Sequence, residues 1–489
     1  MRIGIGRIQN EISPIHKLPH YLLQVVFHHA CFSGQYKTSS AAAALSHVCH
    51  RWRAILLSTP QFWCRVMVNG RDPSFPAACI ARSDNLPLDV TVQFNYAAPP
   101  LDPHADFRPS VLEDEDVRWH SDECRDGLTL LEAERDRIHQ LNVNYILLGP
   151  GCFQDEIMEY DFFIKSLKNL RELRWNYDDK RGILSLPHQI FGGSLESLRH
   201  LRLENAEPST GRFPKLTSLE CIRVYDARCT TFMRSRMPEF FSQNASLQSL
   251  NIHEFHIYDA PFPRISMDHL TSLMLTRAFR WYLLFDLLDI KNLGGGTFTM
   301  ISFSNQRNWI AFSAVNSIGF SLTASISPCE DPREDDFVRR YFSGVTLIRV
   351  EDFQTIHSTK RLFSILRIFG DSEGDIGRLE LHAETGPHDL YPQVTVFARP
   401  FLSRLGTLAV YLHDHDLGEP RGWRWVGVMI EDLFNPKHHA RFPDECTVEV
   451  YCSNSGIFLS ANMGELRAGF EDQRPYGGLI SRSQPLLPL

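Results

Sequence analysis

A pattern of apolar side chains, L-x-x-L-x-L with other apolar residues allowed, recurs along most of this chain and constrains its fold more than any other feature. Copies start at positions 143, 170, 198, 216, 247, 270, 298, 315, 345, 376 and 405. Neighbouring starts lie 17 to 31 residues apart. A repeat of this length predicts a solenoid, in which each strand and its connection bury an apolar face only against the neighbouring units.

The mean spacing of these copies, about 26 residues, lies inside the range of leucine-rich repeats. The clearest copies start at Leu198, Leu247 and Leu270, and they lack the Asn or Cys that regular repeats carry three positions after the last leucine. In a regular repeat that side chain satisfies backbone groups of the turn. We therefore expect an irregular, degenerate leucine-rich-repeat-like domain over residues 138–466. The alternative is chance recurrence, because the chain is 43% hydrophobic.

The variable positions of the first predicted strands carry arginine in equivalent places: Arg171, Arg174, Arg199 and Arg202. Neighbouring strands lie ~5 Å apart, so stacking would bring four guanidinium groups side by side. Guanidinium groups bind phosphate and carboxylate well, and this arrangement predicts a target-binding anion cradle, for example for a phosphorylated segment. The alternative is an ordinary solvated strand face, with Glu172 and Glu204 nearby.

Residues 12–69 predict three short helices. The first should begin near Leu18-Pro19, because a proline in the first turn costs no hydrogen bond, and its apolar stripe is Leu22, Leu23, Val26, Phe27 and Ala30. The second should follow Ser39-Ser40 and carry Leu45, Val48, Cys49, Trp52, Ile55 and Leu56. The third should begin at Thr59-Pro60 and bury Phe62, Trp63 and Val66.

A module of this size cannot bury all of its apolar surface internally. Its leftover Leu, Phe and Trp side chains form either a partner site or simply the core of the module, and spacing alone leaves both interpretations open. Cys49, placed on the second helix among apolar residues, is expected to pack there rather than to act as a nucleophile.

Three short motifs in this region resemble the F-box, and more narrowly the F-box-like proteins expanded in mushroom-forming fungi. They are Leu18-Pro19, Val48-Cys49-His50-Arg51-Trp52-Arg53 and Ser58-Thr59-Pro60-Gln61-Phe62-Trp63. The family often has an acidic residue two places after the proline, where this chain has Tyr21. The resemblance implies an α+β or α/β chain with a small N-terminal three-helix F-box at 12–69, followed by the irregular leucine-rich-repeat-like solenoid.

The resemblance also implies a partner, the Skp adaptor of a cullin–RING ubiquitin ligase. The chain would then be a substrate-recognition subunit of an SCF-type (Skp–cullin–F-box) E3 ligase, whose repeat region binds a target protein and which supplies no catalytic residue. The alternative is a non-ligase F-box scaffold or decayed paralogue that acts only as a protein-binding module. By position, the adaptor-binding residues would be Leu18, Pro19, Leu22, Leu23, Val26, Leu45, Val48, Cys49, Trp52, Ile55, Leu56 and Pro60.

Residues 70–137 separate these two regions. Residues 70–101 are expected to connect them, with a strand at Leu86 to Val92, where apolar and polar side chains alternate. Residues 102–136 hold 12 acidic residues and 4 arginines, a net charge of −8. We interpret 102–137 as a solvated, disordered acidic insertion, with an acidic arm for a basic partner as the alternative.

Composition and missing motifs narrow the function further. A net charge of −8 gives no reason to expect binding to nucleic acid or an anionic membrane. No apolar run spans a bilayer, the N-terminus lacks a signal-peptide pattern, and the 11 cysteines contain no C-x-x-C pair, which together predict a cytoplasmic or nuclear chain. No nucleophile or phosphate-loop motif occurs, and His413, His415, His438 and His439 are too isolated to predict a metal. No cofactor is expected, and residues 1–11 and 467–489 are interpreted as tails.

Overall fold

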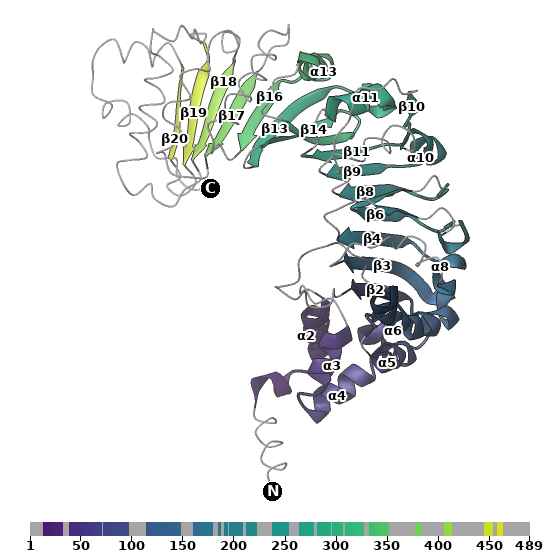
Figure 1. Ribbon diagram of the computed structural model, residues 1–489. Helices are drawn as coiled ribbons and strands as arrows, with labels where there is room; N and C mark the ends of the chain where they lie inside the picture. Colours follow the sequence, from purple (N-terminus) through teal and green to yellow (C-terminus); the bar gives the residue numbers. More distant parts are fainter. Residues whose placement is uncertain are drawn as a thin grey trace, which may run out of the picture. The chain divides into compact units, whose positions relative to one another are not determined.

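The computed structural model describes residues 13–32, 39–70, 72–96, 114–147, 160–178, 184–186, 190–193, 195–208, 212–222, 237–253, 264–277, 281–294, 296–306, 309–326, 332–351, 377–383, 405–412, 445–452 and 457–462. The fold is mixed α/β. The chain divides into two compact units, Met1–Ser246 and Leu247–Leu489. Each unit carries a mostly parallel β-sheet, and the first also carries a group of short N-terminal helices (Figure 1).

The N-terminal helices are η1 (Pro14–Lys17), α2 (His20–Phe32), α3 (Ser39–Ser46), α4 (His50–Leu57) and η2 (Pro60–Trp63). On α2, Leu23, Phe27 and Cys31 are spaced four residues apart, so they share one helix face, and all three are buried. Ile55 and Leu56 of α4 are buried in the same group of helices. The indole N–H of Trp63 donates to the Leu56 carbonyl at 2.8 Å and ties η2 to the end of α4.

The predicted second helix is two helices, since the chain breaks the helix at residues 47–49. Cys49 is extended and precedes α4, and its sulfur accepts the backbone N–H of Trp52 at 3.4 Å. The prediction that placed Cys49 inside a helix is therefore wrong, because the side chain caps the helix start instead. The predicted third helix is only the 3-10 turn η2, and Val66 belongs to the strand that follows.

The sheet of the first unit consists of parallel strands in chain order (Figure 1): β1 (Arg65–Val68), β2 (Leu88–Tyr96), β3 (Ile138–Leu147), β4 (Glu172–Asp178), β6 (His200–Glu204) and β8 (Ser218–Ile222). The strand predicted near Leu86 to Val92 is confirmed as β2. Parallel neighbours need a crossover connection between them, and short helices and turns supply several of these. The remaining elements of the unit are α5 (Ser74–Arg82), α6 (Asp114–Ala133), η3 (Arg135–Arg137), α8 (Asp161–Ile164), β5 (Leu184–Ser185), η4 (Ile190–Gly193), β7 (Ala206–Glu207) and α10 (Met237–Gln243).

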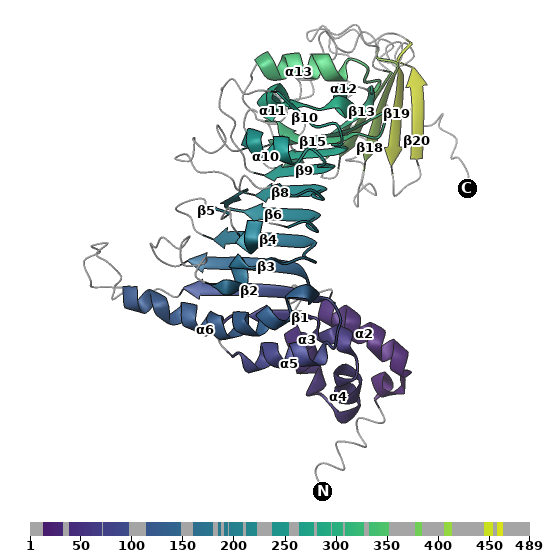
Figure 2. The same cartoon turned by 90° about the vertical axis from the view of Figure 1, so that its right-hand side faces the viewer.

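The acidic segment is not the disordered insertion that its charge predicted. From Asp114 to Ala133 it forms helix α6, which packs beside β1 and β2 (Figure 2). Cys124, Leu128 and Leu131 recur at four and three residues and are buried, so one apolar stripe holds the helix against the sheet. The disorder prediction is therefore wrong for 114–137, while residues 102–113 lie outside the described part of the chain.

The apolar repeat corresponds to the buried positions of the strands. Register pairs Leu141 with Leu173, Leu173 with Leu201, and Leu201 with Leu219, which makes one column of buried leucines across β3, β4, β6 and β8. Burying each such side chain contributes ~1.5–3 kcal/mol. The copy predicted to start at 143 is out of phase, since the buried positions of β3 are Ile138, Leu141, Val143 and Tyr145.

The turns before β4, β6 and β8 close with the same backbone hydrogen bond, from an N–H to the carbonyl three residues earlier. Leu170 N–H donates to Leu167, Leu198 to Leu195, and Leu216 to Phe213. These acceptor residues are buried as well, so the repeat extends three residues further upstream than L-x-x-L-x-L. In the sequence this signal is the apolar residue at 167, 195 and 213, three positions before each copy.

Asparagines outside the expected position satisfy backbone groups between successive connections. Asn169 donates to the Asp136 carbonyl at 2.7 Å, and Asn205 donates to the Tyr177 carbonyl at 2.7 Å. Buried Asn244 accepts the backbone N–H of Phe213 at 2.8 Å. Asparagines at irregular positions thus satisfy backbone groups of these turns and connections.

The second unit has a sheet with the order β9-β11-β15-β14-β13-β16-β17-β18-β19-β20. Neighbours in this order are parallel except β15–β14, β14–β13 and β19–β20. Its strands are β9 (Ser249–His253), β11 (Ser272–Thr276), β13 (Phe298–Gln306), β14 (Trp309–Asn316), β15 (Ser321–Ile326), β16 (Leu347–Glu351), β17 (Arg378–Ala383), β18 (Thr407–Leu412), β19 (Thr447–Cys452) and β20 (Ile457–Asn462). Its other elements are β10 (Ile265–Ser266), η5 (Trp281–Leu283), α11 (Leu284–Leu287), β12 (Leu288–Asp289), α12 (Lys291–Gly294) and α13 (Pro332–Phe342).

The repeat copies behave unequally in this unit. Those at 270 and 345 supply buried residues of parallel strands, Leu273 and Ile348. The copy predicted at 315 is wrong, because Val315 lies on the antiparallel strand β14 and is 50% exposed. The late strand-like runs, 378–382, 407–412 and 447–452, are confirmed as β17, β18 and β19. Residues 1–11 and 467–489, interpreted as tails, lie outside the described residues.

Candidate functional site

Helix α2 is apolar on two opposite faces. One face is buried, as described above. The other carries Tyr21, Leu22, Val25 and Val26, which we call the apolar face of α2, and Tyr21 and Val25 are 63% and 62% exposed. These positions follow an i, i+1, i+4, i+5 pattern, so they form one stripe along the helix. A helix with apolar side chains on two opposite faces normally packs on both of them. In α2 the second apolar face is exposed to solvent.

Exposed large apolar side chains are concentrated near this helix. The described residues contain ten of them, and five are Tyr21, Leu22, Val25, Val26 and Val48, the last in the turn between α3 and α4. The other five are spread singly or in pairs over the rest of the described chain. Single exposed apolar residues are ordinary, whereas a stripe on one helix marks an interaction surface.

The predicted adaptor-binding residues separate into three groups by burial. Leu23, Ile55 and Leu56 are core residues, so they cannot contact a partner directly. Leu18, Leu45, Cys49, Trp52 and Pro60 are half-buried. Pro19, Leu22, Val26 and Val48 are exposed. The predicted docking set did not include Tyr21 and Val25. Their i, i+4 spacing, which runs beside that of Leu22 and Val26, is the signal that could have identified them.

The apolar face of α2 is held by contacts on the opposite side of the helix. Phe27 meets Trp52 of α4 edge to face, with ring centroids 4.9 Å apart. Gln24 donates to the Thr59 hydroxyl at 3.1 Å, and Arg51 donates to the carbonyls of His16 and Leu18, the latter at 2.6 Å. These contacts tie α2 and the turn before it to α4 and the residues after it, so the exposed stripe lies on a helix that is packed on its other side.

The four predicted arginines form two pairs, not one cradle. Arg174 and Arg202 lie opposite each other in the register of β4 and β6. Arg171 and Arg199 precede those strands, three residues away and thus ~10 Å along the strand direction, and the Arg199 N–H donates to the Arg171 carbonyl at 2.8 Å. Arg174 pairs with Glu172 at 2.6 Å and Arg202 with Glu220 at 3.0 Å. Arg174 and Arg202 are substantially exposed, whereas Glu172 and Glu220 are half-buried.

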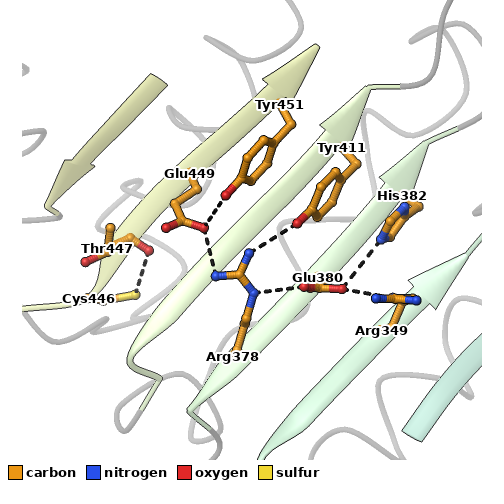
Figure 3. A network of polar contacts seen from close by, with 9 residues as sticks. All are labelled: Arg349, Arg378, Glu380, His382, Tyr411, Cys446, Thr447, Glu449 and Tyr451. Atoms are coloured by element: carbon orange, nitrogen blue, oxygen red, sulfur yellow. Dashed lines mark hydrogen bonds and ion pairs between the residues drawn. The ribbon is translucent and has the colours of Figure 1, made fainter. Parts of the chain in front are cut away.

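A second polar surface lies on β16 to β19 (Figure 3). Arg378 contacts Glu380 and Glu449, each at 2.8 Å, and donates to the Tyr411 hydroxyl at 3.2 Å. Arg349 pairs with the other oxygen of Glu380 at 2.8 Å. Beside them the rings of His382, Tyr411 and Tyr451 stack across three strands, with centroids 4.3 and 4.5 Å apart. We call these seven residues the polar network.

The polar network is electrostatically closed. Its two arginines balance its two glutamates, and all three nitrogens of Arg378 contact a partner. Burial opposes ionisation of Glu380, but the hydrogen bonds from Arg378 and Arg349 outweigh it and lower the pKa of Glu380. These contacts join four strands and engage every nitrogen of the Arg378 guanidinium group within the protein.

Among the described residues, metal-ligating side chains do not gather, and two buried cysteines are poor nucleophiles. No three His, Cys, Asp or Glu side chains gather there as metal ligands would, and the four histidines considered in the sequence lie outside this part. Burial raises the pKa of Cys79 to about 11, and burial followed by the charge of Glu220 raises that of Cys221 to about 12. Such thiols are packed and inert.

The helices in the described part are too short or too polar to cross a bilayer. Neither a scan of protein-family models nor a search of curated proteins finds a significant match to this chain.

Proposed function

We propose that this chain is the substrate-recognition subunit of an SCF-type E3 ubiquitin ligase. In this proposal the N-terminal helices are an F-box that docks on the Skp adaptor, and the strand-and-turn region that follows is a degenerate leucine-rich-repeat-like solenoid that binds a target protein. The chain contributes no catalytic group. It accelerates ubiquitin transfer by holding target lysines near the charged E2, which raises their effective concentration.

The observation that supports the adaptor contact is the exposed apolar face of α2. It lies within the segment whose motifs resemble the F-box, and it includes Leu22 and Val26 from the predicted docking set. Its side chains are exposed while the opposite face of the same helix is fully packed. Covering such a stripe with a partner removes apolar area from water, at about 25 cal/mol per Å² before the costs of association.

The test is co-expression of the full chain with the Skp adaptor, followed by size-exclusion chromatography and an affinity measurement. The wild-type chain should co-elute with the adaptor. Val26→Asp places a charge in the apolar contact, and we expect binding about a hundredfold weaker, since an unpaired buried charge costs several kcal/mol. Tyr21→Ala should weaken binding less, because it removes only contact area.

Ile318→Asp is the matched control, because Ile318 is also an exposed apolar residue, 55% exposed, but lies in a turn of the second unit. This variant should bind the adaptor like wild type. Leu23→Asp is unsuitable, since Leu23 is fully buried and the substitution would unfold the helices. Wild-type binding by a folded Val26→Asp chain would contradict the proposed docking face.

A second experiment, ubiquitin transfer in a reconstituted ligase, separates the ligase receptor from a non-ligase scaffold. A receptor should support ubiquitin transfer to a bound target in a reconstituted ligase, and this activity should disappear with Val26→Asp. A chain that binds the adaptor through α2 but never promotes transfer to any bound protein would be a scaffold or a decayed paralogue.

A further inference from the structure

The polar face of the first unit's sheet, opposite the buried leucine columns, has a regular chemical layout. Strand β3 carries three amide side chains on it at alternate positions, Gln140, Asn142 and Asn144, which we call the amide row. Register places Asn142 beside Arg174, and Arg174 beside Arg202. The face therefore combines a row of amides along one strand with a pair of guanidinium groups across the next two strands.

The amides of this row are available for hydrogen bonding. Asn142 and Asn144 are half-buried and Gln140 is exposed, and their side chains make no hydrogen bond to another described residue. Each primary amide offers one carbonyl acceptor and two N–H donors. Half-buried amides in this state are satisfied by water, which a ligand with matching donors and acceptors can replace.

The spacing of the amide row matches the repeat of an extended peptide. Alternate residues of a strand lie ~6.6–6.8 Å apart, which is the separation between neighbouring amides of the row. An extended chain presents the N–H and C=O of every second residue along the same edge, with the same repeat. A peptide laid along β3 can therefore place one N–H and C=O pair over each amide, and each amide can bind that pair with two hydrogen bonds.

The two arginines beside this row favour an anion on the peptide. Arg174 and Arg202 are each paired with one carboxylate, at exposed sites where an ion pair contributes only ~0–1 kcal/mol. A single carboxylate on a ligand would merely exchange for Glu172 or Glu220. A phosphate carries nearly two charges and three acceptor oxygens, so it can bridge both guanidinium groups at once.

We propose that the sheet face of β3, β4 and β6 binds an extended phosphorylated peptide. The amide row reads the peptide backbone, and Arg174 and Arg202 hold the phosphate. The role of this peptide as a target segment rests on the proposed receptor function, but its binding does not require the adaptor. The site needs an extended backbone and one phosphate, and it is indifferent to most other side chains.

The experiment measures fluorescence anisotropy of a labelled peptide with the full chain alone. The probe is a peptide of about ten residues, alternating threonine and valine, with one central phosphoserine and a lysine at each end. The same peptide with serine, and with glutamate, in place of phosphoserine should bind about tenfold weaker or worse. Equal binding of the three would overturn the phosphate assignment.

Backbone recognition is tested without changing the protein. Two isomeric phosphopeptides are N-methylated on one or the other set of alternate residues, so that each blocks one edge of the extended chain. The phosphate fixes which edge faces the sheet, so one isomer should bind about tenfold weaker and the other nearly as well as the parent. Equal affinities of the two isomers would overturn the role of the amide row.

Variants of the chain assign each effect to its residues. Asn142→Leu with Asn144→Leu should weaken phosphopeptide and serine peptide alike, whereas Arg174→Met with Arg202→Met should abolish the preference between them. Gln248→Leu, an exposed amide in the second unit, and Arg339→Met, an exposed arginine on α13, are the matched controls and should change neither.

The outcomes separate this inference from the proposed function. Loss of adaptor binding with intact phosphopeptide binding would remove the ligase function and leave the peptide site. Adaptor binding without any phosphopeptide binding would remove the peptide site alone.

Discussion

Two sheet faces of this protein carry arginines in register with acidic and polar neighbours, and they differ in how completely those groups are paired. On β16 to β19, Arg378 uses all of its nitrogens on Glu380, Tyr411 and Glu449. On β3 to β6, Arg174 and Arg202 each contact one glutamate, and both remain substantially exposed. Similar side chains on similar parallel strands thus form a closed network in one place and an open surface in the other.

We infer from this difference that the state of pairing, and not polar composition, distinguishes a structural surface from a binding surface. Glu380 is buried and needs its arginines, because an unpaired buried charge is costly. Glu172 and Glu220 remain partly exposed and can be solvated by water when their arginines leave. Substitutions in the polar network should therefore lower the unfolding free energy strongly, and substitutions on the open face should change it little.

The largest effect is expected when the closed network loses its central residue. Arg378→Met keeps much of the aliphatic stem but leaves Glu449 and one side of Glu380 without a cation. We expect the second unit to lose about 3 kcal/mol of unfolding free energy, as when one partner of a buried pair is removed. Urea unfolding followed by circular dichroism measures this loss.

Arg339→Met is the control within the same unit, since Arg339 is exposed and pairs only loosely with Asp336 at 3.8 Å. Its unfolding midpoint should remain that of the wild type. An equally small effect for Arg378→Met would show that the ion pairs of the polar network contribute as little to stability as those of the open face.

A smaller effect is expected from acid. Hydrogen bonds from Arg378 and Arg349 lower the pKa of Glu380 despite its burial, so ionised Glu380 stabilises the folded state. That contribution is complete above the ordinary carboxyl pKa of 4.5 and is lost as the pH falls through the lower folded-state value.

The melting temperature of the second unit, recorded from pH 7 to pH 3, checks this dependence. The wild-type value should fall more steeply below pH 4.5 than that of Glu380→Gln, which lacks the titrating group. Parallel curves for the two chains would mean that Glu380 contributes no acid sensitivity.

The sequence predicted the positions of the strands better than the side-chain contacts between them. The spacing of buried leucines identified β4, β6, β9 and β11, and it placed Arg174 beside Arg202 correctly. It could not find the contact of Arg378 with Glu449, because those residues lie on strands two apart and 71 positions apart in sequence. Such a contact depends on the register of several strands joined by long connections, which local periodicity does not contain.

Helices α2 and α6 also depend on tertiary contacts that the local sequence pattern does not contain. The pattern on α2 revealed apolar residues at two sets of positions, but only the packing of Phe27 on Trp52 decides which set is buried. For α6, a high net charge predicted disorder, whereas burial of Cys124, Leu128 and Leu131 against the sheet stabilises a helix. Tertiary contacts outweighed composition there, as they commonly do for amphipathic segments.

The smallest effect on stability is expected on the open face. Arg174→Met with Arg202→Met removes two exposed ion pairs, each contributing little, so the unfolding free energy should change by less than about 0.5 kcal/mol. The measurement is the same urea titration, repeated at low and high salt, since exposed pairs are screened and their small contribution should vanish at high salt. A loss comparable with that of Arg378→Met would show that these arginines hold the sheet together, in which case a ligand could not recruit them without unfolding it. A near-neutral result leaves both guanidinium groups exchangeable, which is the property that a phosphate-binding surface requires.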